Sequence, residues 1–181
     1  MVFTPVVLIV LLMSCLLALL LSLWGTPVAG NAAMRFGIVD KPDGRLKRHT
    51  TTIPYLGGLA IFTSFLVSLS VAYRFDKHLL GILLAGTIIA LLGLIDDLGA
   101  LSPGVKLAGQ LIAVWCLINS EVRIKIAIFP LWVQIVLTIL WVMAMINAVN
   151  LIDIMDGLAA GVCSVIALVL LVNALLSGNV N

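Results

Sequence analysis

The sequence predicts an all-α polytopic transmembrane bundle of about six membrane helices. Of its 181 residues, 63% are hydrophobic and 10% are charged, whereas roughly a quarter of the residues in a soluble domain are charged. The mean hydropathy is +1.28. A bilayer core about 30 Å thick takes roughly 20 helical residues to cross, so the length allows at most about seven spans. We therefore expect one transmembrane domain over residues 1–181.

Apolar runs define the expected helices in order. The first, 6–24, has no Lys or Arg before it and is too long for the core of a signal peptide, so it predicts a membrane helix. The others are 54–73, 79–95, 105–118, 127–148 and 158–176, of which the run 105–118 is short for a span. The connections 25–53, 96–104 and 149–157 then share one side of the membrane.

The distribution of charge orients this topology. The side that contains these three connections carries six of the ten basic residues, which favours the cytoplasm. The net charge of +2 is too small to indicate a nucleic-acid partner. The three cysteines lie singly in apolar runs, so neither a disulfide framework nor a zinc site is expected.

Asp96 and Asp97 end the run LLGLIDD, where ionised carboxylates need solvent, a partner or a cation. Adjacent carboxylates repel each other, and this favours a divalent metal, although a solvated helix end is the plain alternative. Ser102, Pro103 and Gly104 predict the start of the next helix. Lys106 would add its charge to that helix N-terminus and suit a phosphate, or would simply reach the membrane interface.

The segment NAVNLIDIMDGL places four polar residues three positions apart, which would form one slowly drifting stripe on a helix. Interhelical hydrogen bonds would explain the amides but not the two acids, which could take a metal or a proton. These residues are Asn147, Asn150, Asp153 and Asp156. Gly157 would permit the turn into the last helix.

The first connection contains the most basic segment, DKPDGRLKRH. Its cations suit either anionic lipid headgroups or a diphosphate substrate, and composition alone does not separate a membrane anchor from a binding site. The candidate residues are Lys41, Arg45, Lys47, Arg48 and His49.

Three motifs together resemble the polyprenyl-phosphate N-acetylhexosamine-1-phosphate transferases, bacterial membrane enzymes of the glycosyl transferase 4 type. The motifs are DKPDGRLKRHTTTIPYLGG, GLIDDLGALSPGVKL and NAVNLIDIMDGL. The resemblance implies transfer of a sugar 1-phosphate from a UDP-N-acetylhexosamine to undecaprenyl phosphate, with release of UMP. It also implies a magnesium cofactor, with manganese as the alternative, and a homodimer. The enzyme would lie in the bacterial inner membrane with its active face in the cytoplasm. Its product would initiate the synthesis of cell-envelope polysaccharides, including lipopolysaccharide.

The resemblance implies roles for those residues of this sequence that match the motifs of the family. Asp96, Asp97, Asn150 and Asp156 would be catalytic, and Asp96, Asp97 and Asp153 would hold the metal. The basic loop residues, Lys106 and Asn147 would bind substrate. The first loop looks more like that of the N-acetylglucosamine branch of the family.

Two other functions remain open on sequence grounds. The family continues through further helices beyond the point that matches Asn181, and Ile154 stands where the family usually has glycine. We therefore expect the N-terminal portion of such a transferase, and the first alternative is an inactive remnant that binds lipid or a partner. A small transporter would use intramembrane Asn and Asp groups, but the acids here gather at one membrane face.

Overall fold

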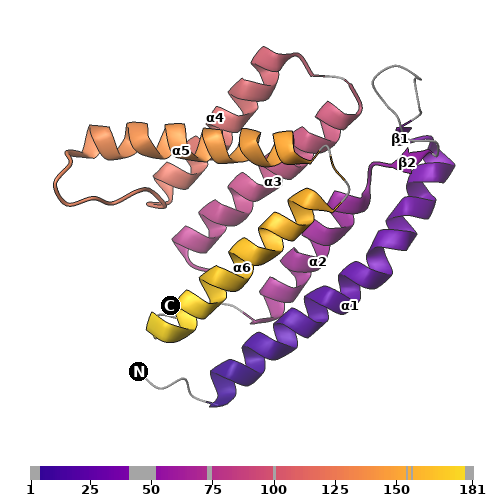
Figure 1. The fold of residues 1–181 in the computed structure, drawn as a ribbon, viewed down its shortest axis with the longest axis horizontal. Helices are drawn as coiled ribbons and strands as arrows, with labels where there is room; N and C mark the ends of the chain where they lie inside the picture. The colour runs from indigo at the N-terminus through magenta and orange to yellow at the C-terminus, as the bar shows by residue number, and fades with distance from the viewer. Residues whose placement is uncertain are drawn as a thin grey trace. The chain divides into compact units, whose positions relative to one another are not determined.

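A computed structural model describes residues 5–40, 52–72, 75–99, 101–153, 155 and 157–177. These residues form six helices and one short strand pair (Figure 1). The helices are α1 (Pro5–Phe36), α2 (Gly57–Ala72), α3 (Lys77–Asp97), α4 (Pro103–Asn119), α5 (Leu131–Ile152) and α6 (Leu158–Ser177). The strands are β1 (Val39–Asp40) and β2 (Ile53–Pro54).

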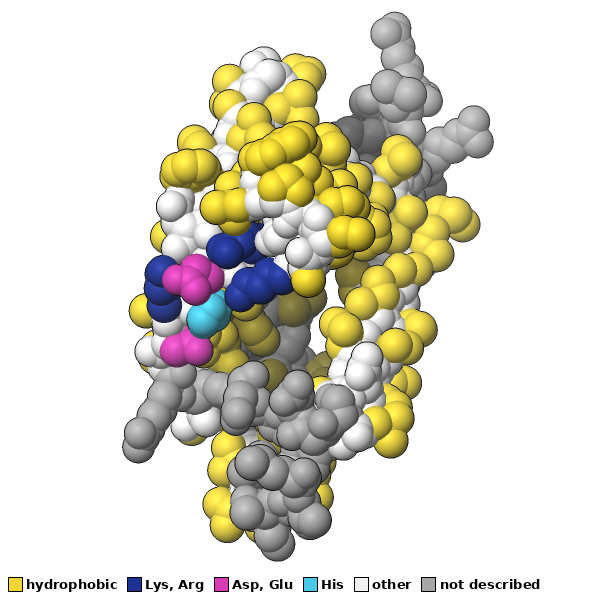
Figure 2. Space-filling view, turned by 90° about the vertical axis from the view of Figure 1, so that its left-hand side faces the viewer, with side chains coloured by type: hydrophobic (Ala, Val, Ile, Leu, Met, Phe, Trp, Pro, Cys, Tyr) yellow, Lys and Arg dark blue, Asp and Glu magenta, His cyan; other side chains and the backbone are white. Residues whose placement is uncertain are grey.

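The helices confirm the prediction of an all-α membrane bundle. Four of them, α1, α3, α5 and α6, are long and apolar enough to cross a membrane, while α2 and α4 are shorter apolar helices of 16 and 17 residues. At most 11% of any candidate span is buried within the protein. Figure 2 shows one face covered largely by hydrophobic side chains, with few charged ones. Such surfaces are expected to contact lipid or other helices.

The chain divides into two compact units, one comprising Ile9–Val122 and the other Arg123–Asn181 with Met1–Leu8. In the first unit, α3 and α4 form an antiparallel hairpin, which is the most extensive helix pairing in the structure. Small residues allow this close approach: a Cβ at Gly81 would overlap the Ser120 side chain, and one at Gly109 would lie 2.6 Å from Leu92 Cδ1. In the second unit, α5 pairs with α6.

Two helices extend by four or more residues beyond their predicted C-terminal ends. Residues 25–36 were expected to belong to the first connection, but α1 continues through Pro27 to Phe36. Proline is tolerated in membrane helices because neighbouring groups satisfy the freed carbonyl. With 32 residues, α1 is about 48 Å long and exceeds the bilayer core. Helix α5 likewise ends at Ile152 rather than near residue 148.

The strand pair joins the two ends of the first connection. Val39 pairs with Pro54 and Asp40 with Ile53 in an antiparallel register. Gly37 has a φ of +71°, a conformation that favours glycine, and lies between α1 and β1. Asp40 and Ile53, which flank residues 41–52, are therefore held side by side after the last turn of α1.

Candidate active site

Asp96 and Lys106 form an ion pair at the connection between α3 and α4. The Lys106 Nζ lies 2.6 Å from the Asp96 Oδ2, and the Lys106 and Asp96 side chains are 23% and 29% exposed. A charge-assisted hydrogen bond of this length between half-buried groups fixes both side chains. The structure therefore brings together the carboxylate and the lysine that were predicted to share one short loop.

The turn that brings them together is local. Helix α3 ends where the Gly99 N–H donates to the Asp96 carbonyl oxygen at 2.8 Å, with Gly99 at a φ of +70°. Helix α4 starts with Ser102 at the N-cap and Pro103 in its first turn, as predicted, although the Ser102 side chain makes no capping hydrogen bond. Proline suits this position because its missing N–H would have had no partner within the helix. Lys106 therefore lies on the first turn of α4, opposite the last turn of α3.

Asp97 differs from its neighbour in exposure. Its side chain is exposed, whereas that of Asp96 is half-buried against α4. Successive helical residues do not face each other, so the two carboxylates at the end of α3 have different surroundings. Lys106 engages Asp96, and the Asp97 residue is the more exposed of the two.

The predicted Asn/Asp stripe is located at the end of α5, in the second unit. Asn147 and Asn150 lie in the last turns of the helix, Asp153 is its C-cap, and all three are exposed. The Asn147 Nδ2 donates to the Met143 carbonyl oxygen of its own helix at 2.8 Å. Gly157 has a φ of +76° directly before α6, as its predicted role in the turn requires.

Several predicted site residues lie outside the described part of the chain. They are Lys41, Arg45, Lys47, Arg48, His49 and Asp156, together with Ile154. Their roles in substrate binding and catalysis stay predictions.

The described residues contain no group of three or more His, Cys, Asp or Glu side chains arranged to hold a metal ion. The donor chemistry of the aspartate pair nevertheless suits magnesium, which is commonly bound by one or two carboxylates together with substrate phosphates. Asp153 belongs to the other unit, so its sharing of a metal with Asp96 and Asp97 stays a prediction.

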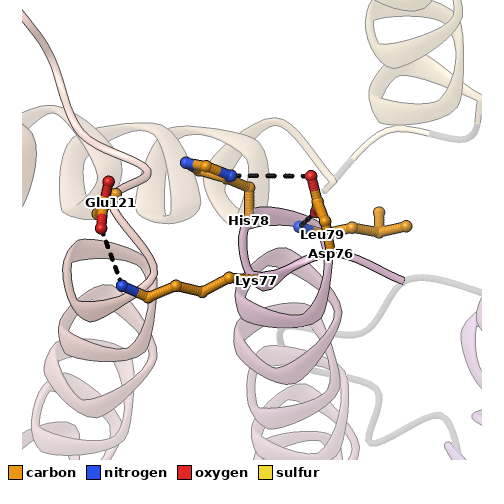
Figure 3. A network of polar contacts seen from close by, with 5 residues as sticks. All are labelled: Asp76, Lys77, His78, Leu79 and Glu121. Carbon is orange, nitrogen blue, oxygen red and sulfur yellow. Dashed lines mark hydrogen bonds and ion pairs between the residues drawn. The ribbon is translucent and has the colours of Figure 1, made fainter. Parts of the chain in front are cut away.

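A second charged network lies at the opposite end of the α3–α4 hairpin (Figure 3). From the sequence, its residues marked only the boundaries between apolar runs. The Leu79 N–H donates to Asp76 Oδ1 at 2.7 Å and caps α3, while His78 Nδ1 lies 3.8 Å from Asp76 Oδ2. Lys77 Nζ lies 2.9 Å from Glu121 Oε1, just beyond α4. An Asp directly before an apolar run is an N-cap signal that could have identified this end of α3.

Comparison with known proteins places these features in a family. Residues 79–181, more than half of the chain, match the family model described as Glycosyl transferase family 4. The chain belongs to glycosyl transferase family 4. The region matched by the family model includes the aspartate pair, Lys106 and the end of α5.

Curated relatives extend the match toward the N-terminus. A protein of Bacillus subtilis (strain 168), named "Probable undecaprenyl-phosphate N-acetylglucosaminyl 1-phosphate transferase", is 35% identical over 162 residues, covering 84% of this family 4 chain and 45% of the relative. The "Undecaprenyl-phosphate alpha-N-acetylglucosaminyl 1-phosphate transferase" of Thermotoga maritima is 34% identical, with coverages of 79% and 46%. The "Decaprenyl-phosphate N-acetylglucosaminephosphotransferase" of Mycobacterium leprae is 30% identical, with coverages of 81% and 41%.

The family 4 chain thus spans about half the length of the curated relatives it matches. No solved structure matches it. Its apolar helices and its bacterial relatives make it a multi-pass membrane protein.

Proposed function

We propose that this chain supplies the aspartate-pair and Asn/Asp segments of an enzyme that transfers N-acetylhexosamine 1-phosphate from a UDP-sugar to undecaprenyl phosphate. UMP is the second product, and the lipid-diphosphate sugar initiates cell-envelope polysaccharide synthesis at the cytoplasmic face of the bacterial plasma membrane. The observation that carries the proposal is the Asp96–Lys106 pair, with Asp97 beside it, in a chain of this family. The names of the relatives support the substrate class.

The reaction joins two anions, which defines what the protein must supply. An oxygen of the lipid phosphate forms a bond to the phosphorus that carries the sugar, and the bond from that phosphorus to the UMP oxygen breaks. Positioning of the reactants and neutralisation of their charge dominate the catalysis of such transfers. Lys106, held in place by Asp96, would bring a fixed positive charge to one of the phosphates.

Asp97 has the exposure that a catalytic carboxylate at this site requires. It either accepts the proton of a protonated lipid phosphate or holds the metal, and Asp96 shares these two roles only when Lys106 releases it. Asn147 and Asn150 offer amide groups for the UDP-sugar, with Asp153 and Asp156 as further acids. The cationic segment containing Lys41, Arg45, Lys47, Arg48 and His49 would bind the diphosphate.

Magnesium fits the donor chemistry of Asp96 and Asp97, and manganese is the alternative. When bound, the ion supplies positive charge that stabilises the transferring phosphoryl group. The UDP-sugar is proposed to be UDP-N-acetylglucosamine, in line with the relatives' names, and a homodimer is the proposed assembly.

The test is transfer of label from UDP-N-acetylglucosamine, with the radioactive phosphorus next to the sugar, into an organic-extractable lipid. Membranes containing a chimera, in which this chain replaces the matching segment of the Thermotoga maritima relative, should incorporate label only when undecaprenyl phosphate and a divalent cation are present. A small transporter, by contrast, would move label or ions across sealed vesicles without forming a labelled lipid. Flux without lipid labelling would therefore reject the transferase proposal.

A further inference from the structure

Gln110 is the largest fully buried side chain in the described part of the chain, and it is polar. It is 1% exposed and lies on α4, where Ala113 and Val114 are buried to the same degree. Between Lys106 and Asn119 it is the only side chain of α4 that carries an amide, a hydroxyl or a charge. An apolar side chain of similar size would fill this position without the cost of removing an amide from water. The purely structural explanation of the amide is a hydrogen bond between helices.

The position of Gln110 relative to Lys106 suggests a second explanation. The two residues are four positions apart, so they lie on the same face of α4, about 6 Å apart along its axis. Both belong to the less exposed side of the helix, whereas Leu107 and Leu111 are exposed. Side chains on a helix lean toward its N-terminus. The Gln110 amide is therefore expected to extend toward the stem of Lys106.

The packing of α3 against α4 places the ion pair directly above this buried layer. A Cβ at Gly109 would lie 2.6 Å from Leu92 Cδ1, so the two helices are in close contact beside Gln110. One helical turn nearer the connection between the helices, the Lys106 Nζ meets the Asp96 Oδ2 at 2.6 Å. The pair therefore rests on a closely packed layer in which Gln110 is the polar member.

A buried amide at this depth acts on the lysine in two ways. The lysine stem is flexible, and its ammonium is a compact charge that can turn toward solvent or toward another anion. The volume of the Gln110 side chain limits the conformations of the stem above it. The amide also carries a dipole, which acts more strongly on a charge in poorly solvated surroundings than it would in water. An apolar side chain of the same size would retain the first effect and lose the second.

We propose that Gln110 is a positioning residue whose buried amide holds the Lys106 ammonium at Asp96. The inference rests on the proposed function for the purpose of the ion pair, which is to offer a fixed positive charge to a phosphate of the reaction. Gln110 acts through Lys106 and touches neither substrate nor metal. Its loss should therefore slow the phosphoryl transfer step more than it weakens substrate binding.

The first experiment measures the ion pair in the chain itself, in detergent micelles. A double-mutant cycle with Asp96→Asn and Lys106→Met gives the coupling free energy of the pair. In the Gln110→Met background the same cycle should give a coupling about half as large or smaller, because methionine fills the space but has no amide. Circular dichroism checks that each variant keeps its helix content. Unchanged coupling in this background would overturn the proposal.

Two further variants separate the amide from its packing. Val114→Ala is the matched control, because Val114 is equally buried one turn further along α4 but is apolar. It should lower stability through the space it leaves, and the coupling between Asp96 and Lys106 should not change. Gln110→Asn retains an amide and should keep part of the coupling that Gln110→Met loses. Equal losses of coupling in Gln110→Met and Val114→Ala would show that packing alone sets the pair, and would overturn the proposal.

The second experiment measures transfer kinetics in the chimera with the Thermotoga maritima relative. Gln110→Met should lower kcat about tenfold, equivalent to about 1.4 kcal/mol. It should change the KM for UDP-N-acetylglucosamine less than about twofold. Val114→Ala should leave both constants unchanged. An unchanged kcat in Gln110→Met, or a loss confined to KM, would contradict the positioning role.

The two experiments distinguish this inference from the proposed function. Weaker coupling in Gln110→Met, together with an unsubstituted chimera that keeps its helices and forms no product, would reject the proposed function and leave the positioning of Lys106 intact. Product formation, together with a coupling that Gln110→Met does not change, would reject the positioning role and leave the proposed function intact.

Discussion

The Lys106 ammonium lies 2.6 Å from the Asp96 carboxylate, where the last turn of α3 meets the first turn of α4. Because both side chains are half-buried, removing one charge leaves the other without its partner in a poorly solvated position. The pair therefore has two consequences: it stabilises one end of the hairpin, and it fixes a cation beside the aspartate pair.

The contribution of this pair to stability is measurable by a double-mutant cycle. Lys106→Met should lower the free energy of unfolding by about 1–3 kcal/mol, because the Asp96 carboxylate loses its ammonium partner. The double variant Asp96→Asn/Lys106→Met should lose less than the sum of the two single variants. Unfolding in mixed micelles of increasing denaturing detergent gives the three values. Strict additivity would show that the two groups are not coupled.

Gly81 is expected to be intolerant of a side chain. A Cβ there would overlap the Ser120 side chain across the hairpin, so Gly81→Ala should destabilise the protein by about 1–3 kcal/mol. Ser120→Gly in the same chain should restore part of the loss by removing the opposing atoms. Thermal unfolding in detergent measures both effects.

Gly93 provides the matched control for Gly81. It lies in the same helix, and a Cβ there would meet nothing within 4 Å. Gly93→Ala should raise stability by up to about 1 kcal/mol, because alanine favours the helix. Equal destabilisation by Gly81→Ala and Gly93→Ala would contradict the tight Gly81–Ser120 contact.

Glu121 combines an unfavourable backbone with a weak ion pair. Its φ is +64°, a left-handed conformation that costs a residue with a side chain about 1 kcal/mol or more. Its pair with Lys77 is exposed and worth about 0–1 kcal/mol. Both Glu121→Gly and Glu121→Gln remove the pair, but only the first relieves the backbone. The Gly variant should unfold at higher detergent than the Gln variant, and the reverse order would contradict this conformation.

The sequence predicted the helices well because each apolar run produces one of them. The ends were less predictable. Gly25 and Pro27 are usual turn signals, yet the largely apolar stretch from Val28 to Phe36 lets α1 continue beyond them. A membrane environment penalises an unpaired backbone, so helix continuation outweighs the local preference of these two residues.

The candidate site was predictable in composition but not in pairing. The motif placed Asp96, Asp97 and Lys106 in one short segment, whereas the choice of Asp96 as the partner of Lys106 depends on how α3 packs against α4. The Gly81–Ser120 contact also depends on packing between residues distant in sequence, which spacing along the chain does not encode.

The central claim is that Asp97 and the Asp96–Lys106 pair belong to a phosphoryl-transfer site. It is tested most directly by measuring UMP release from UDP-N-acetylglucosamine by a chimera in which this chain replaces the matching segment of the Thermotoga maritima relative, which the chain covers to 46%. We predict that the chimera releases UMP when undecaprenyl phosphate and magnesium are present. Asp97→Asn should reduce the rate of UMP release at least about 100-fold. Glu121→Gln, which changes an acid at the other end of the hairpin, should leave this rate unchanged. UMP release that Asp97→Asn does not slow would contradict the account, as would no release from a chimera that inserts in the membrane with its helices intact.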